Sequence, residues 1–181
     1  MGTIGVSVLA VFDHVYGRLV ERLEGLSDDE YLWEPVEGCW SLRPGEDGRW
    51  QLDGGGGGGP APDPVPVTTI AWRLCHVGGL GLLGFANWLF GDGALLPDAI
   101  DYPGRAAVVR GFLDAAYGEW RAGLVTLTDA DWEQPLGETW GSYAESNTLD
   151  LALHLLDELV HHGAEASLLR DLYAARAAER T

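Results

Sequence analysis

The sequence predicts an all-α protein, an antiparallel four-helix bundle with a long Gly/Pro-rich loop between its first and second helices. Two observations carry this prediction. Apolar residues recur at helical spacings of three and four in four long segments, and no stretch of convincing length alternates as a β-strand does. The 181 residues suit a single domain, residues 1–181, with enough length to bury a core.

The first helix is expected over residues 6–26, ending near Gly25. Its apolar residues follow helical spacing and form one stripe: Val8, Leu9, Phe12, Val15, Tyr16, Leu19, Val20 and Leu23. Ser27 then opens the string SDDEYLW, which is typical of a short capped turn with acidic residues at its start.

Glycine and proline dominate residues 35–66. The segment contains six consecutive glycines, residues 54–59, followed by PAPDPVP. Such a composition without periodicity is typical of a mobile surface loop. A phosphate-binding loop is disfavoured, because that function needs a strand before the glycines and a helix directly after them. Trp40 and Trp50 flank the start of the loop and could fold back over a pocket.

The second helix is expected over residues 68–91, capped by Thr68 or Thr69. Its glycines at positions 78, 79, 81 and 84 lower helix propensity, which would be tolerated where another backbone packs closely. The third helix is expected from about residue 104 to 127, with these residues facing inward: Val108, Phe112, Ala115, Ala116, Trp120 and Leu124. After a second capped turn, TDADWEQP, the last helix is expected over residues 148–176.

Charge and composition exclude some classes of function. The net charge of −17 repels polyanions, so nucleic acid is not expected as a partner. No export signal and no uninterrupted apolar run of membrane-spanning length is visible, so we expect a cytoplasmic protein that does not bind membranes. Cys39 and Cys75 are then expected to remain reduced, buried thiols.

The last helix carries three of the five histidines, His154, His161 and His162. Glu158 and His162 are four residues apart and therefore lie on one face, which Leu151, Leu155 and Leu169 share. A carboxylate on a buried face needs compensation, and a metal ion supplies it. His76 on the second helix is the natural third ligand.

Spacing alone leaves other interpretations open. A histidine on an apolar face can be a satisfied core residue, and a Glu–His pair four residues apart can be an ion pair. Asp157 and His161 have the same spacing, but their solvent side indicates a surface ion pair. His14 on the first helix could project into the same cavity, although an ordinary core or surface position is preferred.

Two strings, TTIAWRLCHV and LHLLDELVHHGAEASLLRDLY, resemble the DinB/YfiT-like superfamily, the group that includes the N-terminal domain of mycothiol-dependent maleylpyruvate isomerase. The resemblance implies a four-helix bundle that binds a metal through a second-helix histidine and two ligands four residues apart on the last helix. By position these ligands are His76, Glu158 and His162. The middle ligand is commonly histidine in the family. Glu158 at this position resembles the mycothiol-linked branch, which uses glutamate there.

The resemblance also implies a function. It indicates a divalent metal, Zn²⁺ first and Ni²⁺ second, that binds a small-molecule thiol such as mycothiol for S-transfer to a small electrophile, or for isomerisation. The metal-bound thiol or water would be the reacting group, and these residues could support the ligands: Asp157, His154, His161 and Glu165. Two alternatives stay open, a hydrolase using metal-bound hydroxide and a non-enzymatic stress or binding protein with a structural metal. The sequence does not decide between a monomer and a homodimer.

Overall fold

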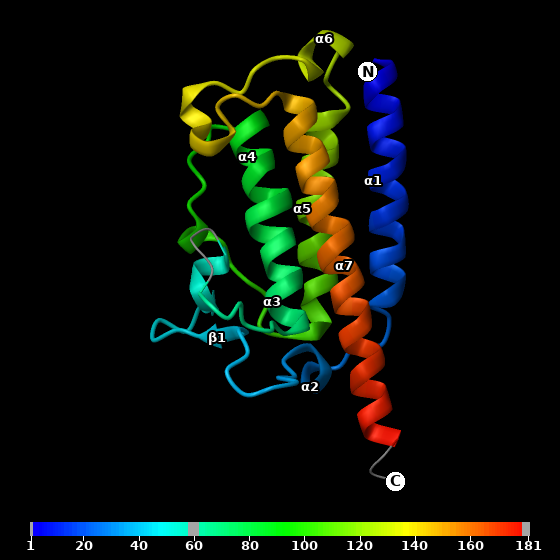
Figure 1. Cartoon of the computed structure of the whole chain (residues 1–181), viewed down its shortest axis with the longest axis vertical. Helices are drawn as coiled ribbons and strands as arrows, with labels where there is room; N and C mark the ends of the chain where they lie inside the picture. Colours follow the sequence, from blue (N-terminus) through cyan, green and yellow to red (C-terminus); the bar gives the residue numbers. More distant parts are fainter. Residues whose placement is uncertain (1, 58–61, 179–181) are drawn as a thin grey trace.

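The computed structural model describes residues 2–57 and 62–178. This part of the chain is mostly helical and contains one small two-stranded sheet, so the prediction of an all-α protein is confirmed. Four long helical columns lie side by side (Figure 1). They are α1 (Thr3–Arg22), the continuous series α3 (Ile70–Cys75), η2 (His76–Leu83) and α4 (Gly84–Phe90), then α5 (Ala106–Leu124) and α7 (Thr148–Ala178).

Short elements connect the columns. The two capped turns expected after the first and third helices are the short helices α2 (Asp28–Tyr31) and α6 (Asp129–Trp132). The Ser27 hydroxyl caps α2, and a capping box between Thr128 and Asp131 begins α6. Two 3₁₀ segments complete the connections, η3 (Pro97–Ala99) and η4 (Glu138–Tyr143).

The second column and α5 run in the same direction, which differs from the expected antiparallel arrangement. Gly78 near the start of η2 lies against Leu113, whereas Phe90 at the end of α4 lies against Gly123. Residues 91–105 therefore return along the length of the bundle before α5 begins (Figure 1). A connection of this length can span about 50 Å when extended, which is why a parallel neighbour is reachable.

One hydrophobic core joins the four columns. Large side chains with less than 2% exposure come from every column and from both short helices: Phe12, Tyr31, Leu74, Leu113, Trp120, Trp132, Leu155 and Leu159. The helix α1 has a window of mean hydropathy 1.3 and is, by length and composition alone, able to cross a membrane. In the structure 44% of that window is buried, as in the core helix of a bundle.

The second column departs from a regular α-helix at its centre. Residues His76–Leu83 form a π-helix, a rare conformation that often marks functional sites. The glycines of this segment are needed for close packing, but against side chains, not against a backbone as predicted. A Cβ atom at Gly78 would lie 2.7 Å from Phe112, at Gly79 2.6 Å from Tyr102 and at Gly81 2.8 Å from Leu155.

The Gly/Pro-rich loop has more structure than its composition predicts. Strand β1 (Leu42–Pro44) pairs antiparallel with β2 (Trp50–Leu52), and the 3₁₀ segment η1 (Asp53–Gly57) follows directly. The Trp72 indole N–H donates to the Asp53 carbonyl oxygen at 2.9 Å, which attaches the loop to α3. Residues 54–57 of the glycine run therefore belong to a 3₁₀ segment, and residues 58–59 lie outside the described part.

The buried faces of α5 and α7 are partly shifted from the predicted ones. On α5, Val108 is 55% exposed and Ala115 is exposed, whereas Val109 and Leu113 are buried. On α7, helical spacing predicts an apolar arc that includes Leu153 and Val160, but they are exposed at 48% and 39%. The α7 face that carries Leu151, Leu155 and Leu169 is buried, as predicted. Both helices have apolar residues on more than one side, and the neighbouring columns decide which side is covered.

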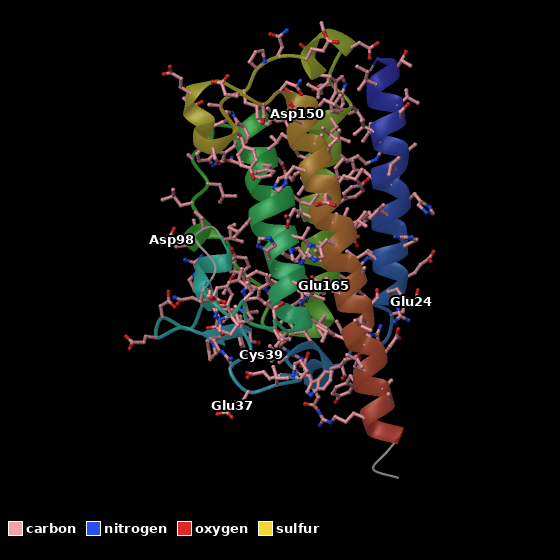
Figure 2. The ribbon with its side chains drawn as sticks, in the orientation of Figure 1. Glu24, Glu37, Cys39, Asp98, Asp150 and Glu165 are labelled. Atoms are coloured by element: carbon pink, nitrogen blue, oxygen red, sulfur yellow. The ribbon has the colours of Figure 1, made fainter. Side chains whose placement is uncertain are left out.

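Both cysteines are free and buried, as predicted. Cys39, labelled in Figure 2, lies in the loop before β1, and Cys75 ends α3. The Cys75 thiol lies 3.4 Å from the Tyr31 hydroxyl. Burial raises the pKa of the Cys75 thiol to about 12. A thiol with so high a pKa remains protonated at neutral pH, so Cys75 contributes packing and not a nucleophile.

Candidate metal centre

Three side chains from two columns meet at one point on the inner face of α7. The Nε2 atoms of His76 and His162 lie 3.2 and 3.1 Å from the same carboxylate oxygen, Oε2 of Glu158. One ligand atom from each residue lies within 4.8 Å of the others, close enough to share a metal ion. His162 is buried at 9% exposure, and His76 and Glu158 are partly buried.

His76 is held on both sides of its ring. The ring stacks on Trp72, one helical turn earlier, with centroids 4.9 Å apart and planes at 8°. Its Nδ1–H donates to the carbonyl oxygen of Gly56 at 2.6 Å. This bond fixes the tautomer, so the Nε2 lone pair faces Glu158.

The contact with Gly56 explains why glycine occupies the loop beside the histidine. Gly56 has φ +75°, in the left-handed region, and a Cβ atom there would lie 2.4 Å from Leu80. Two positions earlier, Gly54 has φ +66°, and a Cβ atom would lie 2.3 Å from the ring of Trp40. Glycine is the residue that meets both requirements without strain. The glycine run thus brings a backbone carbonyl to the ring of His76.

His162 is oriented by a carboxylate. Its Nδ1–H donates to Oε2 of Glu165 at 2.8 Å, so its Nε2 lone pair also faces Glu158. The same Glu165 oxygen accepts from the guanidinium of Arg73, and Oε1 lies 3.1 Å from Nε2 of His161. Glu165, labelled in Figure 2, projects from α7 toward α3. A carboxylate behind a histidine is the usual outer support of a metal ligand.

Electrostatics favour a cation at this point. When Nε2 of His162 or His76 carries a proton, its hydrogen bond holds the pKa of Glu158 well below its usual range, so the carboxyl stays ionised beside these rings. Burial, together with the charges of His76 and Arg73, lowers the pKa of His162 and disfavours an imidazolium there. In the neutral rings, whose Nδ1 atoms donate elsewhere, two nitrogen lone pairs and one carboxylate oxygen converge. Three electron-pair donors at hydrogen-bond distance repel unless a proton or a cation lies between them, so the residues fit a divalent ion.

A second group of potential ligands fits less well. His161, His162 and Glu165 also bring three ligand atoms within 4.8 Å of one another. Here the Glu165 carboxylate already accepts from Arg73, and His162 faces it through a donating Nδ1–H. A positively charged guanidinium at the carboxylate repels a metal cation, so this group is better described as support for the first.

A cavity of about 400 Å³ opens beside the three residues. His76 and Glu158 form part of its wall, and Val77, Leu80, Phe85 and Leu155 make the rest of that side apolar. The Tyr143 hydroxyl, also in the cavity lining, lies 3.0 Å from Nε2 of His154. Burial, and to a smaller extent the charge of Glu158, raises the pKa of Tyr143, so its hydroxyl is protonated at neutral pH.

The structure brings most of the predicted site residues together. His76, Glu158 and His162 meet, and Glu165 and His161 stand behind His162 as supporting residues. His154 lies in the cavity wall beside Tyr143. Asp157 is exposed, without a hydrogen bond or ion pair to another described residue. His14 is exposed on α1, outside the set of residues that line this cavity.

Sequence reasoning missed three contributors to the site. Arg73 carries a signal that could have been used, since a charged residue in an otherwise apolar stretch of the second helix needs a buried partner. Gly56 contributes only its backbone carbonyl, and Tyr143 comes from a loop with no motif. Neither can be recognised without knowing which segments lie beside α3 and α7.

Comparison with known proteins identifies the family. The model of one protein family, the DinB superfamily, matches residues 12–166. The match spans most of the chain, so the chain belongs to the DinB superfamily, which includes metal-dependent enzymes. No curated protein and no solved structure matches it.

Proposed function

We propose that this protein is a metal-dependent enzyme in which His76, Glu158 and His162 hold one divalent ion. One observation carries the proposal: three electron-pair donors, two histidine nitrogens and a carboxylate oxygen, converge at the wall of a cavity that a small molecule can enter. Two histidines and one carboxylate that leave a position open are a recurrent ligand set of catalytic zinc. Sites with imidazole ligands also bind Ni²⁺, so we propose Zn²⁺ as the first and Ni²⁺ as the second candidate for the bound metal.

We further propose that the reaction is thiol-dependent, with a small-molecule thiol and a small electrophile as partners. A divalent ion in this position supplies acidity, since it lowers the pKa of a bound thiol or water toward neutrality. The carboxylate of Glu158 offsets part of the metal's positive charge, so this shift should be smaller than with three neutral histidines. The apolar wall excludes water from the reacting groups.

The Tyr143–His154 pair offers a proton in the wall of the cavity. The tyrosine hydroxyl is protonated, and both residues line the space in which the electrophile would lie. Its hydrogen bond with His154, one helical turn before Glu158 on α7, fixes the position of the hydroxyl. We assign Tyr143 the role of hydrogen-bond donor to a polar group of the electrophile.

Metal analysis tests the site. The purified protein should hold about one equivalent of metal, and His76→Ala, Glu158→Gln and His162→Ala should each lower this content at least tenfold. His14→Ala is the matched control, because it removes an exposed histidine from α1 and should leave the content unchanged. Full metal content in the three variants, by mass spectrometry, would refute the site.

Activity and stability measurements then separate the functions. A panel of small thiols with an electrophilic acceptor should show transfer that chelation abolishes. Hydrolysis of esters or amides without added thiol would identify the hydrolase instead. A structural ion would lower the melting temperature by many degrees on chelation, whereas a catalytic ion should abolish turnover with a much smaller change in melting temperature.

A further inference from the structure

A second cleft of about 420 Å³ lies between α4, the segment before α5 and η4. In Figure 1 the yellow η4 segment lies beside the upper end of α4. The described residues that line the cleft include no charged side chain, and its larger members are Phe85, Trp88, Leu96, Ile100, Trp140 and Tyr143. Such a lining suits an apolar occupant without a charge of its own.

The cleft adjoins the cavity of the candidate metal centre. Leu80, Phe85, Ser142 and Tyr143 line both spaces. The rings of Phe85 and Tyr143 meet edge to face, with centroids 6.0 Å apart. A molecule in the cleft that extends over these two rings would present its other end to His76 and Glu158.

Aromatic side chains shape the apolar end. Trp140 meets Trp88 edge to face, with centroids 5.7 Å apart and planes at 69°, and meets Phe85 at 6.1 Å and 63°. Trp88 and Leu96 remain 45% and 59% exposed at the same cleft. When an apolar ring covers these large apolar side chains, their surface is removed from water, and this burial favours binding of the ring.

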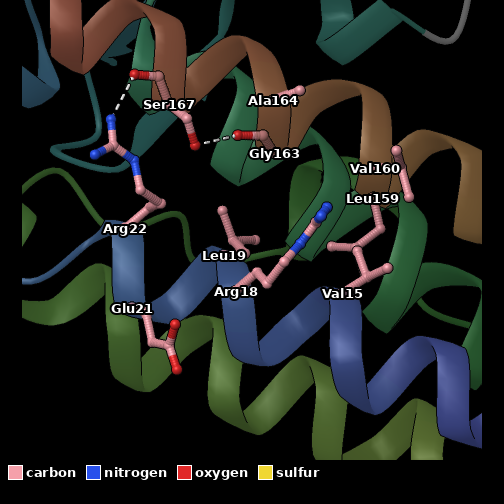
Figure 3. A pocket seen from close by; sticks show the side chains of 10 residues that line it. All are labelled: Val15, Arg18, Leu19, Glu21, Arg22, Leu159, Val160, Gly163, Ala164 and Ser167. Carbon is pink, nitrogen blue, oxygen red and sulfur yellow. Dashed lines mark hydrogen bonds between the residues drawn. The ribbon is translucent and has the colours of Figure 1, made fainter.

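The hollow between α1 and α7 is a weaker candidate (Figure 3). It has a similar volume, about 410 Å³, but Arg18, Glu21 and Arg22 line it. Its described lining includes none of His76, Glu158 and His162, so a ligand there would not reach the metal centre. The lining that the aromatic cleft shares with the cavity of the candidate metal centre therefore favours the aromatic cleft.

We propose that the aromatic cleft binds the ring of an uncharged aromatic molecule, which is the substrate whose polar end reacts at His76 and Glu158. The position of the reacting end rests on the proposed function, whereas binding of the ring needs no metal. An acidic ring compound is a poorer fit, because the cleft offers no cation and the chain carries a net charge of −17.

Fluorescence of N-phenyl-1-naphthylamine, a neutral apolar probe, tests ring binding on the full chain. The wild-type protein should bind the probe saturably, and 1-naphthoate should displace it far less well than neutral 1-naphthol. Leu96→Asp places a charge in the cleft and should weaken binding about tenfold or more. Trp88→Ala removes one aromatic contact and should weaken it about threefold to tenfold.

The matched control is Leu168→Asp. Leu168 is 59% exposed, as Leu96 is, but lies on α7 outside the lining of the cleft. The control should change the dissociation constant less than twofold. Equal weakening by Leu96→Asp and Leu168→Asp, or no weakening by Leu96→Asp and Trp88→Ala, would overturn the cleft as the ring site.

A second comparison tests the link to the metal centre. Naphthalene-2-thiol should displace the probe at least tenfold better than 2-methylnaphthalene in zinc-loaded protein, and this advantage should disappear in His76→Ala. Loss of the advantage in the wild type, with zinc bound and probe binding intact, would overturn the assignment of the ring compound as substrate of the metal centre. If the wild type binds no zinc but Leu96→Asp still weakens probe binding, the proposed function fails and the ring site stands.

Discussion

Replacing Glu165 by glutamine tests whether the carboxylate behind His162 strengthens metal binding. Glu165 accepts from His162 Nδ1–H at 2.8 Å and from the Arg73 guanidinium. Its Oε1 atom lies 3.1 Å from Nε2 of His161, and 30% of its side chain is exposed. Glutamine keeps the size and one oxygen acceptor but removes the negative charge. His162 then becomes a weaker electron donor and loses part of its orientation.

The expected effect follows from the role of the carboxylate. Loss of an outer-shell partner typically lowers metal affinity about 10- to 100-fold, and glutamine should fall near tenfold because one acceptor remains, or about 1.4 kcal/mol. A charge lost at roughly 10 Å from a divalent ion in salt solution should change affinity only about twofold. The two explanations therefore differ by about a factor of five.

The assay is competition for Zn²⁺ against a chromophoric chelator, with the same measurement on Asp157→Asn. Asp157 is the matched control because it lies next to Glu158 on α7, is exposed and removes the same unit of charge. Glu165→Gln should weaken binding about tenfold and Asp157→Asn about twofold at most. Equal losses in the two variants would show that net charge, and not the hydrogen bond to His162, sets the affinity.

Three other changes should have defined effects. Gly56→Ala forces a side chain into a backbone with φ +75° and should cost about 1–2 kcal/mol of unfolding free energy in urea titration, with a weakened metal site; unchanged metal affinity would separate the loop from the site. Leu113→Ala should lower the unfolding free energy by about 2–5 kcal/mol, whereas Val108→Ala, at an exposed position, should lower it by less than about 0.5 kcal/mol. A larger loss in Val108→Ala than in Leu113→Ala would contradict the described buried face of α5. The hydrogen bond from Arg121 lowers the pKa of Asp13 in the folded protein below 3.8, its value in the unfolded chain. The stability that ionised Asp13 contributes is therefore fully present above pH 3.8 and is lost as the pH falls through the folded pKa. In Asp13→Asn the urea midpoint should therefore vary less between pH 2 and 4 than in the wild type, and an unchanged slope would exclude this pair as a source of acid sensitivity.

Much of the fold could be predicted because helical periodicity is a local property. Phe12 and Leu19 on α1, and Leu155 on α7, belong to apolar stripes with helical spacing, and all three are buried. Where a helix carries apolar residues on several sides, periodicity does not select the covered side. Helical spacing predicts that Val108 and Val160 face inward, and both are exposed.

The residues of the candidate site divide in the same way. Glu158 and His162 could be paired from sequence because the geometry of a single helix places residues four apart on one face. His76 could be added because the second helix carries one histidine. The support from Gly56 and Arg73 depends on a hairpin and a π-helix that no local pattern indicates.

The sequence by itself determined the helical class, the segments that form the columns and the residue types of the candidate metal site, because these depend on neighbours within a few positions. Only the tertiary structure decided that the second and third columns run parallel, that the glycine run meets His76 and that an aromatic cleft adjoins the cavity of the candidate metal centre. These features join segments far apart in the chain, and such contacts arise from packing among columns, which no short stretch of sequence encodes.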